Sequence, residues 1–62
     1  MTKYFNLRTS YGVETVDELS RSDFATLKEY RTELRRLASE YRLAGMGVYI
    51  SARSTKEWRQ SR

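Results

Sequence analysis

The chain has 62 residues, and 12 Lys plus Arg against 8 Asp plus Glu give it a formal net charge of +4. It contains no Cys and no His, which excludes disulfides, structural zinc sites, Ser–His triads and Cys nucleophiles. No apolar run approaches the roughly 20 residues of a membrane span, and no signal peptide is visible. We therefore expect a soluble, cytoplasmic, single small domain over residues 1–62 that is not an enzyme and needs no cofactor or metal.

The first part of the chain has the pattern of a β-hairpin. Residues 3–9 alternate apolar and polar side chains, which is typical of a half-buried strand. A turn signal then ends at Gly12, which is free to adopt positive φ. Residues 13–17 are rich in β-formers, but their two valines cannot share a face in a regular strand. We expect a bulge near Thr15 or an early strand end.

Residues 20–45 predict one long amphipathic helix, because apolar side chains recur at spacings of mostly three or four and no Pro or Gly interrupts the run before Gly45. Ser22 is the preferred N-cap and Ser20 is the alternative. At the other end, Gly45 can take the left-handed conformation that terminates a helix.

Residues 48–53 alternate again and predict a third strand, and residues 54–62 follow as a short helical turn or a basic tail. The order β-β-α-β with a right-handed crossover predicts an α+β fold, a three-stranded sheet of order 2-1-3 with the long helix packed on one face. The expected core residues are Phe5, Leu7, Val16, Leu19, Phe24, Leu27, Leu34, Leu37, Tyr41, Val48 and Ile50.

The sheet face opposite the helix is the first candidate binding surface, because the predicted alternation places Tyr and Arg side chains there. Bases can stack on Tyr rings, and Arg binds phosphates or guanine edges. Solvated cross-strand pairs and a dimer surface are the two alternatives. The candidate nucleic-acid or partner-binding residues are Tyr4, Arg8, Tyr49, Arg53, Lys56 and Arg59.

The second candidate is a basic row along one side of the helix, formed by Lys28, Arg31, Arg35 and Arg42. It is either a phosphate-binding row or a solvated flank. Arg36 is expected to be neutralised by the acids three residues before and four residues after it. The acidic residues near position 17 have no metal-ligand spacing. Trp58 is either a plug over the core or a stacking residue.

The segment Tyr41–Ser51, together with the opening Tyr4–Thr9, resembles short uncharacterised proteins of bacteriophages and prophages. This resemblance implies an accessory, regulatory role in a mobile element and transfers no functional residue. A three-stranded sheet with one helix is also similar in outline to integrase-type arm-binding domains, which read DNA with the sheet face.

Two functions follow from the sequence. The first is a small non-enzymatic module that binds DNA or RNA, or regulates, through the Tyr and Arg face of the sheet. The second is a protein-interaction module, which is either a homodimer through that face or an inhibitor of a host protein. No membrane partner is expected under either hypothesis.

Overall fold

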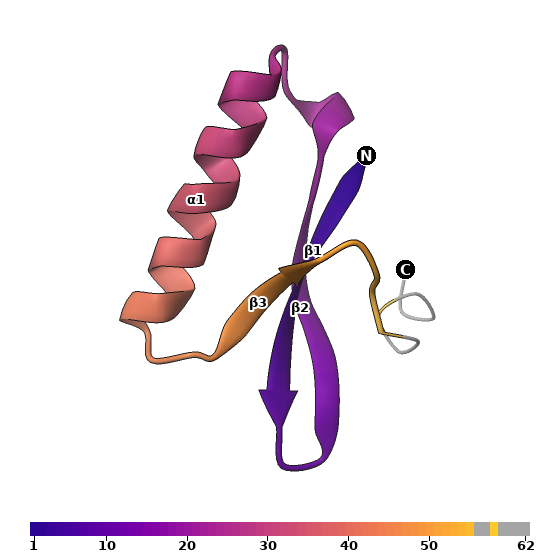
Figure 1. The fold of residues 1–62 in the computed structure, drawn as a ribbon, viewed down its shortest axis with the longest axis vertical. Coiled ribbons are helices and arrows are strands. Elements are labelled where there is room, and N and C mark those ends of the chain that lie inside the picture. The colour runs from indigo at the N-terminus through magenta and orange to yellow at the C-terminus, as the bar shows by residue number, and fades with distance from the viewer. Residues whose placement is uncertain (56–57, 59–62) are drawn as a thin grey trace.

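The computed structural model describes residues 1–55 and Trp58. Its elements in chain order are β1 (Thr2–Thr9), β2 (Gly12–Ser20), the 3-10 helix η1 (Arg21–Asp23), α1 (Leu27–Leu43) and β3 (Val48–Ser51). The strands form an antiparallel sheet of order β2-β1-β3, and α1 lies along one side of it (Figure 1). The predicted α+β fold, with its strand order and single long helix, is therefore confirmed.

The hairpin closes through a two-residue turn between β1 and β2, where Thr9 and Gly12 are direct partners. Gly12 has a φ of 132°, a conformation that is costly for residues with a Cβ atom, so the predicted use of this glycine is confirmed. The Thr9 hydroxyl donates to the Gly12 carbonyl and accepts from the Tyr11 N–H, which holds the turn.

A bulge interrupts the pairing of β1 with β2. Phe5 is the partner of Asp17, whereas the next residue, Asn6, is the partner of Thr15, so Val16 is the extra residue of β2. This is the bulge that the sequence predicts near Thr15. It allows Asp17 to share the helix-facing side with Phe5, while Thr15 shares the opposite side with Asn6.

The start of the helix differs from the prediction, because α1 begins at Leu27 rather than after Ser22. The reason lies in β2, which continues to Ser20 because that residue still pairs with Thr2 of β1. Ser20 is therefore part of the sheet, and its hydroxyl lies 3.0 Å from the Thr2 hydroxyl. A 3-10 turn and extended residues, including Phe24, then carry the chain from the sheet to the helix.

The true N-cap is Thr26, whose hydroxyl accepts from the Glu29 N–H at 3.2 Å. The Glu29 carboxylate reaches back and accepts from the Ala25 N–H at 3.3 Å. This is the reciprocal arrangement of a capping box, with one difference. In a standard capping box the Glu side chain accepts from the N–H of the N-cap residue itself, whereas here it accepts from the residue before the N-cap. The Ser22 and Ser20 caps were wrong because neither serine stands at the first helical turn.

The end of the helix is as predicted. Gly45 has a φ of 78°, and its N–H donates to the Arg42 carbonyl at 3.0 Å. The Met46 N–H donates to the Tyr41 carbonyl at 3.0 Å. These two bonds form a Schellman motif, which satisfies carbonyls that the last helical turn leaves open.

The core is thin, and its two fully buried aromatic residues, Phe5 and Tyr30, come from β1 and α1. The Phe5 ring contacts the Tyr41 ring at a centroid distance of 5.8 Å. The Tyr30 ring contacts Phe24 at 5.6 Å, and its hydroxyl donates to the Leu19 carbonyl at 3.1 Å. Burial raises the pKa of Tyr30 above its ordinary value. Sequence analysis missed Tyr30 as a core residue.

The prediction that Leu27 and Ile50 belong to the core was wrong. Leu27 is 40% exposed because it is the first residue of α1, where the preceding residues do not cover it. Ile50 is 44% exposed because it lies on the edge strand β3, which has β1 on one side and no strand beyond it in the described part of the chain. The other predicted core residues, apart from buried Phe5, are half-buried.

Candidate binding surfaces on the sheet

The face of β1 that points away from α1 carries Tyr4, Asn6 and Arg8, because they alternate with the helix-facing Phe5. Tyr49 of β3 is the direct partner of Asn6, so its side chain lies on the same face. Three of the predicted residues, Tyr4, Arg8 and Tyr49, therefore share one face of the sheet.

Arg8 and Tyr49 are in direct contact on this face. The Arg8 guanidinium carbon lies 5.5 Å from the centroid of the Tyr49 ring, which is a cation–π geometry. Arg8 is exposed, and Tyr49 is 39% exposed. The pair thus offers a positive charge and an aromatic surface side by side, both accessible to a partner.

The middle of the same face is covered by residues 53–55, which run on the side of the strands away from α1 (Figure 1). The Asn6 amide donates to the Arg53 carbonyl at 3.0 Å. Thr15 and Thr55 exchange hydrogen bonds, since each backbone N–H donates to the other hydroxyl, at 3.3 and 2.8 Å. The Thr15 hydroxyl also donates to Asn6 Oδ1 at 2.7 Å.

We call this set of hydrogen bonds the Asn6–Thr15–Thr55 network; it also includes the carbonyl of Arg53. Asn6 is 5% exposed and Thr15 is 8% exposed, so both are buried polar residues with their bonds satisfied. The expectation of a sheet face that is open throughout was therefore wrong. The physical reason is that the chain after β3 folds back and offers backbone partners to polar groups on the sheet.

The predicted site residues have different positions relative to this cover. Arg53 is exposed, its carbonyl accepts from the Asn6 amide, and its N–H donates to Ser51 Oγ at 3.1 Å. Tyr4 is only half-buried, on the central strand. The other two, Lys56 and Arg59, lie outside the described residues. The structure thus describes Arg8, Tyr49 and Arg53 as exposed members of the predicted set.

Trp58 is half-buried, and its indole Nε1 is shielded from solvent. A ring in this position agrees better with the predicted plug than with a fully exposed stacking platform. The helical turn predicted for residues 54–62 falls largely outside the described residues.

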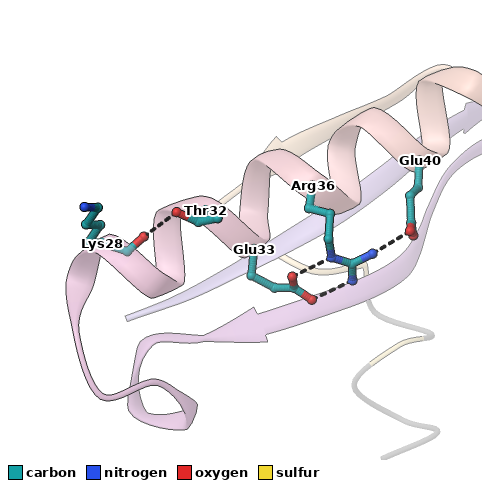
Figure 2. Close-up of polar contacts among 5 residues, drawn as sticks. All are labelled: Lys28, Thr32, Glu33, Arg36 and Glu40. Carbon is teal, nitrogen blue, oxygen red and sulfur yellow. Dashed lines mark hydrogen bonds and ion pairs between the residues drawn. The ribbon is translucent and has the colours of Figure 1, made fainter.

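The two flanks of α1 differ in charge. On one flank, Arg36 is held by Glu33 at 2.6 Å and by Glu40 at 2.5 Å, as the sequence predicts (Figure 2). The hydrogen bond from Arg36 lowers the pKa of the Glu33 carboxyl. On the other flank, the side chains of Arg31 and Arg35 are exposed and have no hydrogen bond or ion pair with any residue the structure describes.

The basic row also includes Lys28 and Arg42 at its two ends, and both are exposed. The Lys28 carbonyl accepts the Thr32 hydroxyl hydrogen at 2.8 Å, while its ammonium group is free of ion pairs in the described chain (Figure 2). The Arg42 guanidinium donates to Ser39 Oγ at 3.3 Å. The row is therefore a largely unneutralised positive flank of α1.

A hollow of about 310 Å³ lies between this flank and β3. It is lined by Arg31, Leu34, Arg35, Ala38 and Ile50. Sequence analysis missed this hollow because it treated Ile50 as a core residue. The available signal was the position of Ile50 on a predicted edge strand, next to a helix flank rich in Arg.

Asp17 has a structural role. Its Oδ1 accepts from the Glu18 N–H at 2.8 Å, and its Oδ2 accepts from the Tyr41 hydroxyl at 3.0 Å. Burial, together with this hydrogen bond and the negative charge of Asp17, raises the pKa of Tyr41. Among the described residues, no group of three or more acidic side chains is placed to hold a metal ion.

Comparisons with protein-family models, with curated proteins and with solved structures found no match for this chain. Within residues 1–55 and at Trp58, no helix has the length and apolar character that crossing a membrane requires.

Proposed function

We propose that this chain is a small non-enzymatic module that binds single-stranded nucleic acid through Arg8, Tyr49 and Arg53. The observation that carries the proposal is the contact of the exposed Arg8 guanidinium with the exposed Tyr49 ring. Bases stack on such rings without sequence preference, and Arg supplies both a stacking plane and a phosphate contact. One exposed ring beside one guanidinium suits the splayed bases of a single strand better than a duplex, which a sheet contacts by inserting strands into a groove.

Charge supports this proposal. The chain has an excess of four positive charges, and Arg8 and Arg53 have no acidic partner among the described residues. If each of these arginines contacts one phosphate, the affinity falls with salt at a slope of about −0.7 per contact. Raising the salt fourfold then weakens binding by about sevenfold.

The test is a titration of a fluorescently labelled 12-nucleotide single strand with the full chain, followed by anisotropy at low salt. Tyr49→Ala should weaken binding by about fivefold to 150-fold, because stacking of one base is worth about 1–3 kcal/mol. Tyr11→Ala is the matched control, since Tyr11 is 99% exposed at the hairpin turn and is not part of the Arg8–Tyr49 contact. Equal losses in the two variants, or no binding by the natural chain at low salt, reject the proposal.

Protein binding is the second candidate function, and a specific observation favours it. The core contains few fully buried apolar residues, while Ile50 remains 44% exposed on the edge strand. A partner that covered this residue would add the apolar burial that so small a domain lacks. Light scattering tests the homodimer form of this candidate, because a strict monomer at high concentration rejects it. A host-protein partner would be sought by pull-down. An accessory role in a bacteriophage or prophage stays a prediction.

A further inference from the structure

We propose that the hollow between α1 and β3 is a docking site for an extended protein segment that adds a strand to the free edge of β3. This segment presents an apolar side chain to the hollow and acidic side chains two residues to either side of it. The inference goes beyond nucleic-acid binding and gives the second candidate function, protein binding, a partner of defined chemistry.

The first support is the edge of β3. In the described chain β3 pairs only with β1, so the backbone N–H and C=O groups of alternate residues on its other edge are available. Such edges bind extended peptides by main-chain hydrogen bonds, while pockets for alternate side chains give specificity. Because β3 has four residues, Val48–Ser51, the partner needs only a short strand.

The second support is the apolar floor beside that edge. Ile50 points to the helix-facing side of β3, since it is the direct partner of Phe5. It lines the hollow with Leu34 and Ala38, and it is 44% exposed. A strand added next to β3 would lie about 4.8 Å from it, which places its helix-facing side chains against this floor.

The third support is the charge of the rim, which selects the partner. Arg31 and Arg35 line the hollow and have no ion pair with the described residues, whereas Arg36 on the opposite flank is neutralised by its two acids. The unpaired charge of α1 is therefore on the side where the partner would dock. Acidic side chains on the helix-facing side of the added strand complement it.

A second copy of this chain fits the site less well. If β3 paired with β3 of another copy about a two-fold axis, each groove would face its own equivalent. Arg31 and Arg35 of both copies would then come together, and like charges at an interface disfavour the complex. The geometry points to an acidic partner rather than to self-association.

The experiment uses the full chain labelled with ¹⁵N and a capped peptide, Thr-Glu-Thr-Val-Thr-Glu-Thr, which carries Glu and Val on one face and neutral Thr on the other. We expect amide shifts in residues 48–51 and in the 31–38 part of α1. The charge-reversed peptide, with Lys in place of Glu, should bind at least tenfold more weakly. Arg35→Glu should weaken binding of the acidic peptide by at least tenfold.

Arg8→Glu is the matched control, because it makes the same change in charge at an exposed residue on the sheet face away from this hollow. It should change the peptide affinity by less than threefold. Equal effects of the two variants, equal binding of both peptides, or no shifts at millimolar peptide overturn the inference. So do concentration-dependent shifts of the same residues without peptide, which would indicate a second copy.

Failure of this inference can be distinguished from failure of nucleic-acid binding. The Tyr49 side chain lies on the other face of β3 from the hollow, so Tyr49→Ala should abolish oligonucleotide stacking and retain the acidic peptide. A chain that binds the oligonucleotide but not the peptide rejects only the docking site. Loss of peptide binding in Tyr49→Ala would contradict the assignment of two separate surfaces.

Discussion

Replacing Thr15 with Val removes one hydroxyl from the centre of the Asn6–Thr15–Thr55 network and leaves the shape of the side chain almost unchanged. The hydroxyl makes two short bonds, donating to Asn6 Oδ1 at 2.7 Å and accepting from the Thr55 N–H at 2.8 Å. Thr15 is 8% exposed and Asn6 is 5% exposed, so water cannot easily replace the lost partner. Asn6 would keep its bond to the Arg53 carbonyl.

The expected loss of stability follows from these contacts. A net contribution of about 1 kcal/mol per hydrogen bond, with the further cost of leaving buried groups unsatisfied, gives about 2–4 kcal/mol for Thr15→Val. The whole domain is stable by about 3–9 kcal/mol at 0.05–0.15 kcal/mol per residue. We therefore expect the thermal midpoint to fall by on the order of 10–30 °C, measured by circular dichroism.

Two further measurements make this prediction specific. Thr15→Ser keeps the hydroxyl and should recover most of the lost stability, whereas a general packing defect would not be repaired by a smaller side chain. Hydrogen exchange of the Thr55 amide should accelerate in Thr15→Val, because its acceptor is gone. An unchanged melting midpoint together with an unchanged Thr55 exchange rate would refute the role of the network in holding residues 53–55.

Two other predictions concern α1. Burial and the Asp17 carboxylate raise the pKa of Tyr41 in the folded protein. The stability that the protonated Tyr41 hydroxyl contributes is therefore constant below about pH 10 and is lost as the pH rises through the folded pKa. Tyr41→Phe should therefore lower stability by about 1 kcal/mol at pH 7 and make the loss above pH 10 shallower in melting curves; an equally steep loss contradicts this. Gly45→Ala should cost about 1–2 kcal/mol through its φ of 78° alone, since a Cβ there has nothing within 4 Å. Gly47→Ala, which is equally open and has no positive φ, should be neutral or stabilising, and equal costs in chemical denaturation would refute the reasoning.

The parts of the fold that sequence analysis predicted correctly depend on short-range patterns. Alternation over residues 3–9 identified the central strand, and Gly12 located the turn. The two valines of β2 signalled the bulge, because their spacing conflicts with the two-residue period of a strand. Connection rules then ordered the sheet, since few topologies are open to two strands, a helix and a third strand.

The start of the helix shows why a local pattern was not sufficient. The sequence offered serines at 20 and 22 and the Thr26–Glu29 pair, and the last of these is the stronger capping pattern. Apolar residues continue at helical spacing upstream of Thr26, so the helix was expected to begin before this residue. A long-range contact determines where the helix can begin, because pairing with Thr2 keeps Ser20 in the sheet.

The cover over the sheet had no signal in the sequence. Alternation tells which side chains share a face, but it does not tell what lies on that face. Thr15 and Thr55 are 40 positions apart, and each is an ordinary polar residue in its own segment. Tyr30, by contrast, was recognisable, because it stands four residues before Leu34 and seven before Leu37, on the apolar side of α1.

The central strand β1 is covered by α1 on one face and by residues 53–55 on the other, and this explains why both proposed surfaces involve β3. On the central strand, Phe5 is buried beneath α1, and Asn6 is buried beneath residues 53–55. On β3 the direct partners of these two residues, Ile50 and Tyr49, remain 44% and 39% exposed. The helix and the folded-back segment thus protect opposite sides of β1 and leave both sides of the edge strand accessible. Both proposed partners therefore contact β3, a nucleic acid through Tyr49 and Arg8 and an acidic strand through Ile50 and the Arg-rich flank of α1.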